Sequence, residues 1–104
     1  MSREQYKILI LPTYEFDLYE AVKYIKDVLK NQTAAEKLII DTDKAIRDRA
    51  FSPLLVKPYP TKQKRKQLYY PIYVRNYIIF YVVIGNVMEI RRLIYRKRNI
   101  DNIL

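Results

Sequence analysis

The 104-residue sequence contains no cysteine, no histidine and no tryptophan, and it has a single glycine. The lack of cysteine excludes a disulfide framework. The joint lack of cysteine and histidine excludes a Ser-His or Cys-His nucleophile and a thiolate or imidazole metal site. One glycine cannot build a glycine-rich loop around a phosphate. We therefore expect no metal and no cofactor.

Long apolar runs are also missing. The run Ile8–Leu11 near the N-terminus is too short for the core of a signal peptide or for a membrane span. We therefore expect a cytoplasmic protein with no membrane partner. The length suits one domain, residues 1–104, with a single modest core.

Negative charge is scarce in the second part of the chain. Residues 1–61 hold ten Lys or Arg against nine Asp or Glu, whereas residues 62–104 hold ten against two, so nearly all of the net charge of +9 lies there. Such a field favours a polyanion or an acidic protein partner. A basic surface that serves solubility alone is the plainer alternative.

Tyrosine is abundant in the same region, where seven of the eleven tyrosines lie between Tyr59 and Tyr95. Cations interleaved with aromatic rings are typical of surfaces that bind single-stranded nucleic acid. Tyrosine is also a good strand former, so each ring can equally be part of a sheet's core.

Two helices are predicted near the N-terminus. Thr13 is placed to cap a helix over residues 14–31, whose apolar residues recur at helical spacing. Thr33 and Glu36 form a capping box for a second helix over residues 34–50. The short link between the two helices predicts an antiparallel αα-hairpin.

Strand-like segments occupy most of the remaining chain: residues 6–11, 67–74, 77–84 and 87–95. Arg75-Asn76 and Gly85-Asn86 predict the two turns that join the last three strands, the second a type II′ turn with glycine first. Pro71 cannot donate to a ladder, so its strand should lie at an edge. The expected fold is α+β in the order β-α-α-β-β-β, a helical hairpin packed on a small, mostly antiparallel, twisted sheet.

Arg91 and Arg92 are adjacent in the last strand. In a regular strand they would point to opposite faces, unless a bulge changes the register. An arginine on the inner face needs a carboxylate partner, either Glu89 or one on the helices.

The segment 74–104, VRNYIIFYVVIGNVMEIRRLIYRKRNIDNIL, resembles the RelE/ParE superfamily of toxins from bacterial type II toxin–antitoxin systems. The matching motifs are Asn76-Tyr77, Phe80-Tyr81, the final-strand run Ile90-Arg91-Arg92-Leu93-Ile94-Tyr95, the basic cluster Lys97-Arg98-Asn99, and the closing Ile103-Leu104. Tyr95 stands where the family often has His, and Asn99 replaces an Asp.

The resemblance implies one of two activities. RelE-type members cut messenger RNA on the ribosome without a metal, using Arg, Lys and Tyr side chains. Ile78 and Leu104 stand where that set has an Arg and a Tyr. The ParE branch lacks the nuclease set, tends to have a longer helical hairpin and poisons DNA gyrase. The sequence therefore favours gyrase poisoning over RNA cleavage. An inactive member that only binds its antitoxin, or a plain nucleic-acid-binding module, remains a third possibility.

The candidate site residues lie in the basic half. For a nuclease, the catalytic candidates are Arg92, Tyr95 and Arg98; a Tyr base would need a pKa lowered by the surrounding arginines. The residues expected to bind the target or nucleic acid are Lys64, Arg65, Lys66, Tyr70, Tyr73, Arg75, Arg91, Arg96, Lys97 and Arg98.

The resemblance also implies a partner. Antitoxins of this superfamily are acidic and partly disordered, and they fold around the toxin, so a hetero-oligomer is expected. The central apolar strand and the sheet edge near Pro71 are the expected grooves for such a segment.

Overall fold

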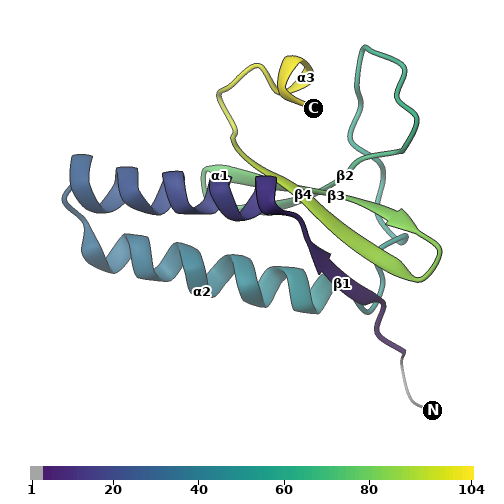
Figure 1. Cartoon of the computed structure of the whole chain (residues 1–104), viewed down its shortest axis with the longest axis horizontal. Coiled ribbons are helices and arrows are strands. Elements are labelled where there is room, and N and C mark those ends of the chain that lie inside the picture. Colours follow the sequence, from purple (N-terminus) through teal and green to yellow (C-terminus); the bar gives the residue numbers. More distant parts are fainter. Residues whose placement is uncertain (1–3) are drawn as a thin grey trace.

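A computed structural model describes residues 4–104. Its elements follow the predicted order, with one short helix added at the end (Figure 1): β1 (Lys7–Ile10), α1 (Pro12–Lys23), a π-helix η1 (Tyr24–Val28), α2 (Gln32–Arg49), β2 (Tyr70–Val74), β3 (Tyr77–Ile84), β4 (Val87–Tyr95) and α3 (Ile100–Ile103). The predicted α+β fold is confirmed.

The four strands form one sheet in the order β1-β4-β3-β2. The last three strands are an antiparallel meander, and β1 joins it in parallel with β4, from Lys7 opposite Val87 to Ile10 opposite Ile90. β2 lies at an edge, as Pro71 predicted.

The main core lies between the helical hairpin and one face of the sheet. Leu38 and Ile46 of α2 and Ile79 and Tyr81 of β3 are buried there. The helices α1 and α2 run side by side, and their connected ends project beyond the sheet (Figure 1). This projection leaves apolar hairpin residues without strands to cover them.

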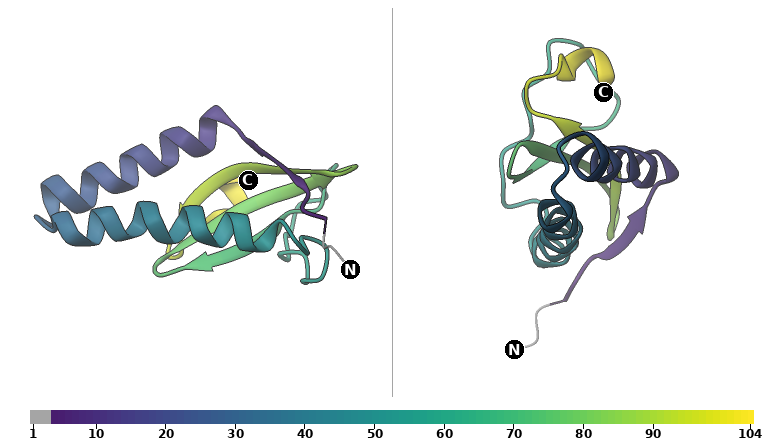
Figure 2. Two further views of the ribbon diagram at one scale, coloured as in Figure 1. Left: turned by 90° about the horizontal axis from the view of Figure 1, so that it is seen from below. Right: turned by 90° about the vertical axis from the view of Figure 1, so that its left-hand side faces the viewer.

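A second, smaller core covers the opposite face of the sheet. Ile78, Phe80 and Ile94 are buried there beneath Ile100 of α3. The ring of Tyr59, in the long connector before β2, meets Phe80 edge-on with the ring centroids 5.0 Å apart. The two views of Figure 2 show the hairpin and the C-terminal segment from the side and end of the sheet. Cover on both faces explains why β3 is almost wholly apolar.

The predicted cap of the first helix is wrong. α1 begins at Pro12, with Leu11 at the cap position and no side-chain hydrogen bond there. Proline suits this first helical position because it has no N–H to leave unpaired and its φ is already helical. Thr13 is therefore inside the helix.

The predicted capping box of the second helix is also wrong. α2 begins at Gln32, and the side-chain oxygen of Asn31 accepts a hydrogen bond of 3.0 Å from the N–H of Ala34. Asn31 performs the task expected of Thr33, because asparagine is an equally good capping residue. The helix consequently starts two positions earlier than predicted.

Both predicted hairpin turns are present. Ile84 pairs with Val87 across Gly85-Asn86, and Gly85 has a φ of +61°. In the Arg75-Asn76 turn, Arg75 has the positive φ, 54°.

A bulge in β4 settles where the two adjacent arginines point. Phe80 lies opposite Arg92, while the next residue, Tyr81, lies opposite Ile90, so Arg91 is an extra residue in the ladder. The bulge turns both guanidinium groups to the side of the second core.

Candidate functional site

One group of arginines in the basic half is held by acidic or backbone partners. The Nε and terminal nitrogen of Arg92 donate to the two carboxylate oxygens of Asp17 over 2.7 and 3.1 Å. The hydrogen bond to Asp17 raises the pKa of Arg92. Asp17 also accepts from the N–H of Leu93 at 3.0 Å. Because β1 ends at Ile10, this carboxylate takes the place of a strand partner at the edge of β4.

Arg91 pairs with Glu89, one of the partners considered for an arginine of this strand. Its Nε donates to Glu89 over 2.8 Å, and a terminal nitrogen donates to the hydroxyl of Tyr69 over 3.1 Å. The guanidinium is therefore fixed beside the second core, partly buried.

Arg65 fastens the C-terminal helix. Its two terminal nitrogens donate to the backbone carbonyls of Leu104 and Asp101, both over 2.6 Å. The backbone N–H of Lys62 donates to the Asp101 carboxylate from the same connector. With a side chain only 15% exposed, Arg65 serves mainly to hold α3 over the second core.

Within residues 4–104, a second group of cations pairs with no carboxylate. Arg96, Lys97 and Arg98 form an exposed turn between β4 and α3, which we call the basic turn. The Arg96 guanidinium lies 4.8 Å above the ring of Tyr73, which is itself 55% exposed. Within residues 4–104, the side chains of Lys97 and Arg98 make no hydrogen bond or ion pair. The basic turn is thus the charge cluster most available to a partner.

The other predicted binding residues are more scattered. Lys64 and Lys66 are exposed in the connector before β2. Arg75 is exposed but already paired with Asp41 at 3.0 Å. Tyr70 is buried and stacks on Tyr81 with ring centroids 5.4 Å apart, so its ring is part of the main core and not of the surface.

The three nuclease candidates do come together. Arg92, Tyr95 and Arg98 line one shallow hollow of about 470 Å³, together with Phe16 and Asp17 of α1. The contact of Asp17 with Arg92 was not predicted from the sequence. The expectation that an arginine of the last strand needs a helix carboxylate was the available signal.

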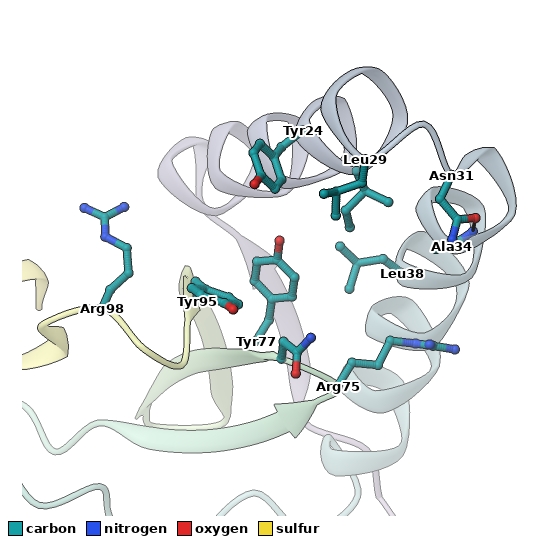
Figure 3. A pocket seen from close by; sticks show the side chains of 11 residues that line it. Tyr24, Leu29, Asn31, Ala34, Leu38, Arg75, Tyr77, Tyr95 and Arg98 are labelled. Carbon is teal, nitrogen blue, oxygen red and sulfur yellow. Dashed lines mark hydrogen bonds between the residues drawn. The ribbon is translucent and has the colours of Figure 1, made fainter.

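A larger hollow of about 690 Å³, the hairpin hollow, adjoins the first at Tyr95 and Arg98 (Figure 3). It lies between the end of the helical hairpin and the sheet. Its lining includes Tyr24 of η1 and Tyr77 of β3, whose roles the sequence did not suggest. The rings of Tyr77 and Tyr95 are 5.7 Å apart.

The pKa of Tyr77, which lines the hairpin hollow, does not suit a catalytic base. Burial raises the pKa of Tyr77, and the neighbouring Tyr95 hydroxyl raises it further. A tyrosine that acts as a base near neutrality needs the opposite shift. Residues 4–104 contain no cluster of acidic side chains that could hold a metal ion. Nor do they include a helix long and apolar enough to cross a membrane.

No protein-family model matches the sequence, and no curated protein matches it either. Among solved structures, a chain of the chromosomal ParDE toxin–antitoxin system from P. aeruginosa is similar, with a TM-score of 0.71. The similarity covers 88% of this chain and 96% of that chain, at 13% sequence identity. This likeness confirms the RelE/ParE-type fold that the sequence motifs suggested.

Proposed function

We propose that this chain is the toxin of a type II toxin–antitoxin pair and that it arrests growth by binding and poisoning DNA gyrase in the cytoplasm. The basic turn is the observation that carries the proposal. Arg96, Lys97 and Arg98 are exposed, and none of them is neutralised by a carboxylate within the described chain. An acidic surface on a protein target complements such a cluster. The fold shared with a chain of a ParDE system supports the same class of protein.

The residues at the positions expected to be catalytic in a nuclease also favour target binding over RNA cleavage. Asp17 accepts from the Nε and one terminal nitrogen of Arg92, and the other terminal nitrogen donates to the Ile103 carbonyl over 3.4 Å. Ile78, at the position where nuclease members have an arginine, is 4% exposed in the second core. Leu104, where a tyrosine would be needed, is tied down by Arg65. One catalytic candidate, Arg92, and two positions that lack the side chains of the nuclease set are thus used for structure.

Ribosome-dependent cleavage of messenger RNA is the second candidate function. The hollow shared by Arg92, Tyr95 and Arg98 favours it, because cations beside an exposed aromatic ring suit a phosphate and a stacked base.

Induction of the chain without an antitoxin separates these functions. We expect growth arrest, a DNA-damage response and no new 5′ ends in messenger RNA. Purified gyrase should lose supercoiling activity and accumulate cleaved DNA when the chain is added. New 5′ ends at fixed codon positions would contradict gyrase poisoning and support the nuclease function. Absence of arrest would contradict the toxin function and leave a protein that only binds a partner.

Alanine substitution tests the site. Changing Arg96, Lys97 and Arg98 together to Ala should abolish arrest while the fold is retained. The matched control changes Lys23, Lys26 and Lys37, three exposed lysines of the helical hairpin, and removes the same charge. The control variant should remain toxic. Full toxicity of the basic-turn variant would show that the site lies elsewhere.

An acidic antitoxin is part of the proposal. A toxin with an exposed basic turn requires a partner that neutralises it, and a disordered acidic segment can order itself on such a surface. The complex is therefore proposed to be a hetero-oligomer of toxin and antitoxin.

A further inference from the structure

The solvent-facing side of α2 carries an apolar residue at its centre, where a surface helix is normally polar. Leu38, Thr42 and Ile46 are buried, so they define the inner side of this helix. With about 3.6 residues per turn, Ile40 points almost directly away from Leu38 and Thr42. Its side chain is 63% exposed, and that of the adjacent Ile39 is 45% exposed. The two isoleucines form a small apolar surface on the outside of the helical hairpin.

The exposed isoleucines border a hollow of about 780 Å³ between α1 and α2. Leu18 of α1 and Ile10 of β1 add further apolar lining to it. An apolar side chain that approaches Ile40 from outside therefore covers surface contributed by both helices. Single exposed apolar residues are common on proteins, but a hollow beside them offers a partner more surface to bury.

The charges around Ile40 are balanced, unlike those of the whole chain. The chain has a net charge of +9, so two copies repel each other over most of their surfaces. On the exposed side of α2, three basic residues offset three acidic ones. These are Lys37, Lys44 and Arg47 against Glu36, Asp43 and Asp48. A second copy of the chain can approach this side without the repulsion that the basic half imposes.

The order of these charges is self-complementary about Ile40. If two copies of α2 lie antiparallel with their Ile40 residues in contact, residues equally far from Ile40 in opposite directions face each other. Glu36 then faces the partner's Lys44, and Lys37 faces the partner's Asp43. Both contacts occur twice, because the arrangement has two-fold symmetry. Every charge within one turn of Ile40 thus meets its opposite.

We infer that two copies of this chain associate through α2, antiparallel and centred on Ile40. The inference goes beyond the proposed function and does not rest on it. The Ile40 side chains lie against each other over the hollows between α1 and α2, and the ion pairs of Glu36 with Lys44 and of Lys37 with Asp43 fix the register. A contact of one helix from each copy is small, so the dimer is a weak one that forms at high protein concentration.

The ion pairs already present within α2 do not oppose this association. Lys44 pairs with Asp48 at 2.9 Å and Arg47 pairs with Asp43 at 2.6 Å, and all four side chains are between 63% and 71% exposed. Exposed pairs of this kind are worth little, so their members can be shared with a second copy at small cost.

The dimer leaves the basic turn of each copy accessible. In Figure 1 and in the end view of Figure 2, α1 lies between α2 and the C-terminal segment. A second copy seated on the outer side of α2 is therefore on the far side of the hairpin from the basic turn. One dimer presents two basic turns.

Sedimentation of the full chain at about 5 to 500 μM, the range suited to small interfaces, tests the association. The wild type should pass from monomer to dimer. Glu36→Lys and Lys44→Glu should each weaken the dimer about tenfold or more, because each places like charges opposite one another at two symmetric positions. An equimolar mixture of the two variants should dimerise about as well as the wild type, since every facing pair is then of opposite sign.

The mixture separates this contact from an effect of net charge alone. Lys44→Glu lowers the positive net charge of the chain by two, and Glu36→Lys raises it by two. If net charge alone governed association, Lys44→Glu would dimerise best and the mixture would lie between its two components. That outcome, or a wild type that stays monomeric at every concentration, would overturn the inference.

A cross-link locates the two-fold axis, and the lack of native cysteine makes each introduced thiol unique. Ile40→Cys places the two thiols of a dimer across the axis, within reach of a disulfide. Leu68→Cys is the matched control, at a residue of nearly equal exposure, 62%, outside α2. Under mild oxidation the Ile40→Cys chain should cross-link about tenfold faster than the control. Equal rates would show that the copies do not meet at Ile40. Neither test depends on growth arrest, so the dimer and the toxin function can each fail alone.

Discussion

Asp17 in α1 and Arg92 in β4, 75 residues apart in the sequence, are joined by two hydrogen bonds of 2.7 and 3.1 Å. The same carboxylate accepts the N–H of Leu93, so one side chain ties the helical hairpin to the last strand. The proposed functional region therefore depends on a contact between an N-terminal helix and the last strand, which are far apart in the sequence.

Replacement of Asp17 should destabilise the protein more than the replacement of an exposed carboxylate does. In Asp17→Ala the partly buried guanidinium and the Leu93 N–H both lose their partner, at a cost of about 2 to 3 kcal/mol. Asp17→Asn keeps an acceptor for the backbone N–H and should lose less. Urea unfolding measures both values.

The control for this prediction is Asp43→Ala. Asp43 pairs with Arg47 in an exposed contact, with both side chains 63% exposed. Its loss should cost no more than about 0.5 kcal/mol. Equal effects of the Asp17 and Asp43 substitutions would mean that the Asp17 contact adds no stability.

Removal of the Arg65 fork should loosen the C-terminal segment before the rest of the fold. Arg65→Ala leaves two backbone carbonyls without their donors, a loss of about 1 to 3 kcal/mol. Amide hydrogen exchange over residues 100–104 should quicken, while exchange in β3 should change less. Lys64→Ala, at an exposed neighbour, is the control and should leave exchange in that segment unchanged.

Stability should fall at alkaline pH through Tyr14. Burial raises the pKa of Tyr14 from 10.0 to about 12. Between these values the unfolded chain releases a proton that the folded chain keeps, so the free energy of unfolding decreases with pH. The full decrease from this group is about 2 to 3 kcal/mol and is complete above pH 12 or so.

Substitution isolates the contribution of Tyr14 to that slope. Tyr14→Phe removes the ionisable hydroxyl, so its unfolding free energy should fall less steeply than that of the wild type above about pH 10. Tyr19→Phe, at a residue that is 61% exposed, should keep the wild-type slope. Parallel slopes for all three proteins would show that Tyr14 ionises normally in the folded state.

The single glycine should be hard to replace for a purely backbone reason. Gly85 has a φ of +61°, and a Cβ built there would meet nothing within 4 Å. Gly85→Ala should therefore cost about 1 kcal/mol of stability through backbone strain and without any clash. Asn86→Ala is the neighbouring control, and a smaller change in the urea midpoint is expected for it. A midpoint unchanged in Gly85→Ala would contradict this account of the turn.

Local patterns allowed much of the fold to be predicted. Helical spacing located both helices, and the turns at Arg75 and Gly85 located the β-meander. The cap predictions were wrong because Pro12 can begin a helix without a side-chain cap, and because Asn31 and Thr33 are both competent caps. The parallel pairing of β1 with β4 joins distant segments, and no local pattern encodes it.

The candidate site was less predictable because the role of each arginine depends on the residues that it contacts in the folded protein. Arg65 and Arg98 look alike in the sequence, yet one is buried under the C-terminal helix and the other is free. The expectation for Arg91 and Arg92 left open whether Glu89 or a helix carboxylate would be the partner, and the structure pairs Arg91 with Glu89 and Arg92 with Asp17. Tyr70 and Tyr73 are three positions apart in a strand whose local alternation puts them on opposite faces, one inside the main core and one beside Arg96.

The bulge at Arg91 determines which single-residue deletions in β4 the fold can tolerate. Without this residue, β4 would alternate regularly from Ile90 through Arg92 and Leu93, and every other pair with β3 would keep its register. Loss of codon 91 therefore preserves both cores and the Asp17 contact. Loss of codon 93, two positions later, would exchange the faces of the residues that follow it. We accordingly expect the fold to tolerate the loss of one residue at the first position and not at the second.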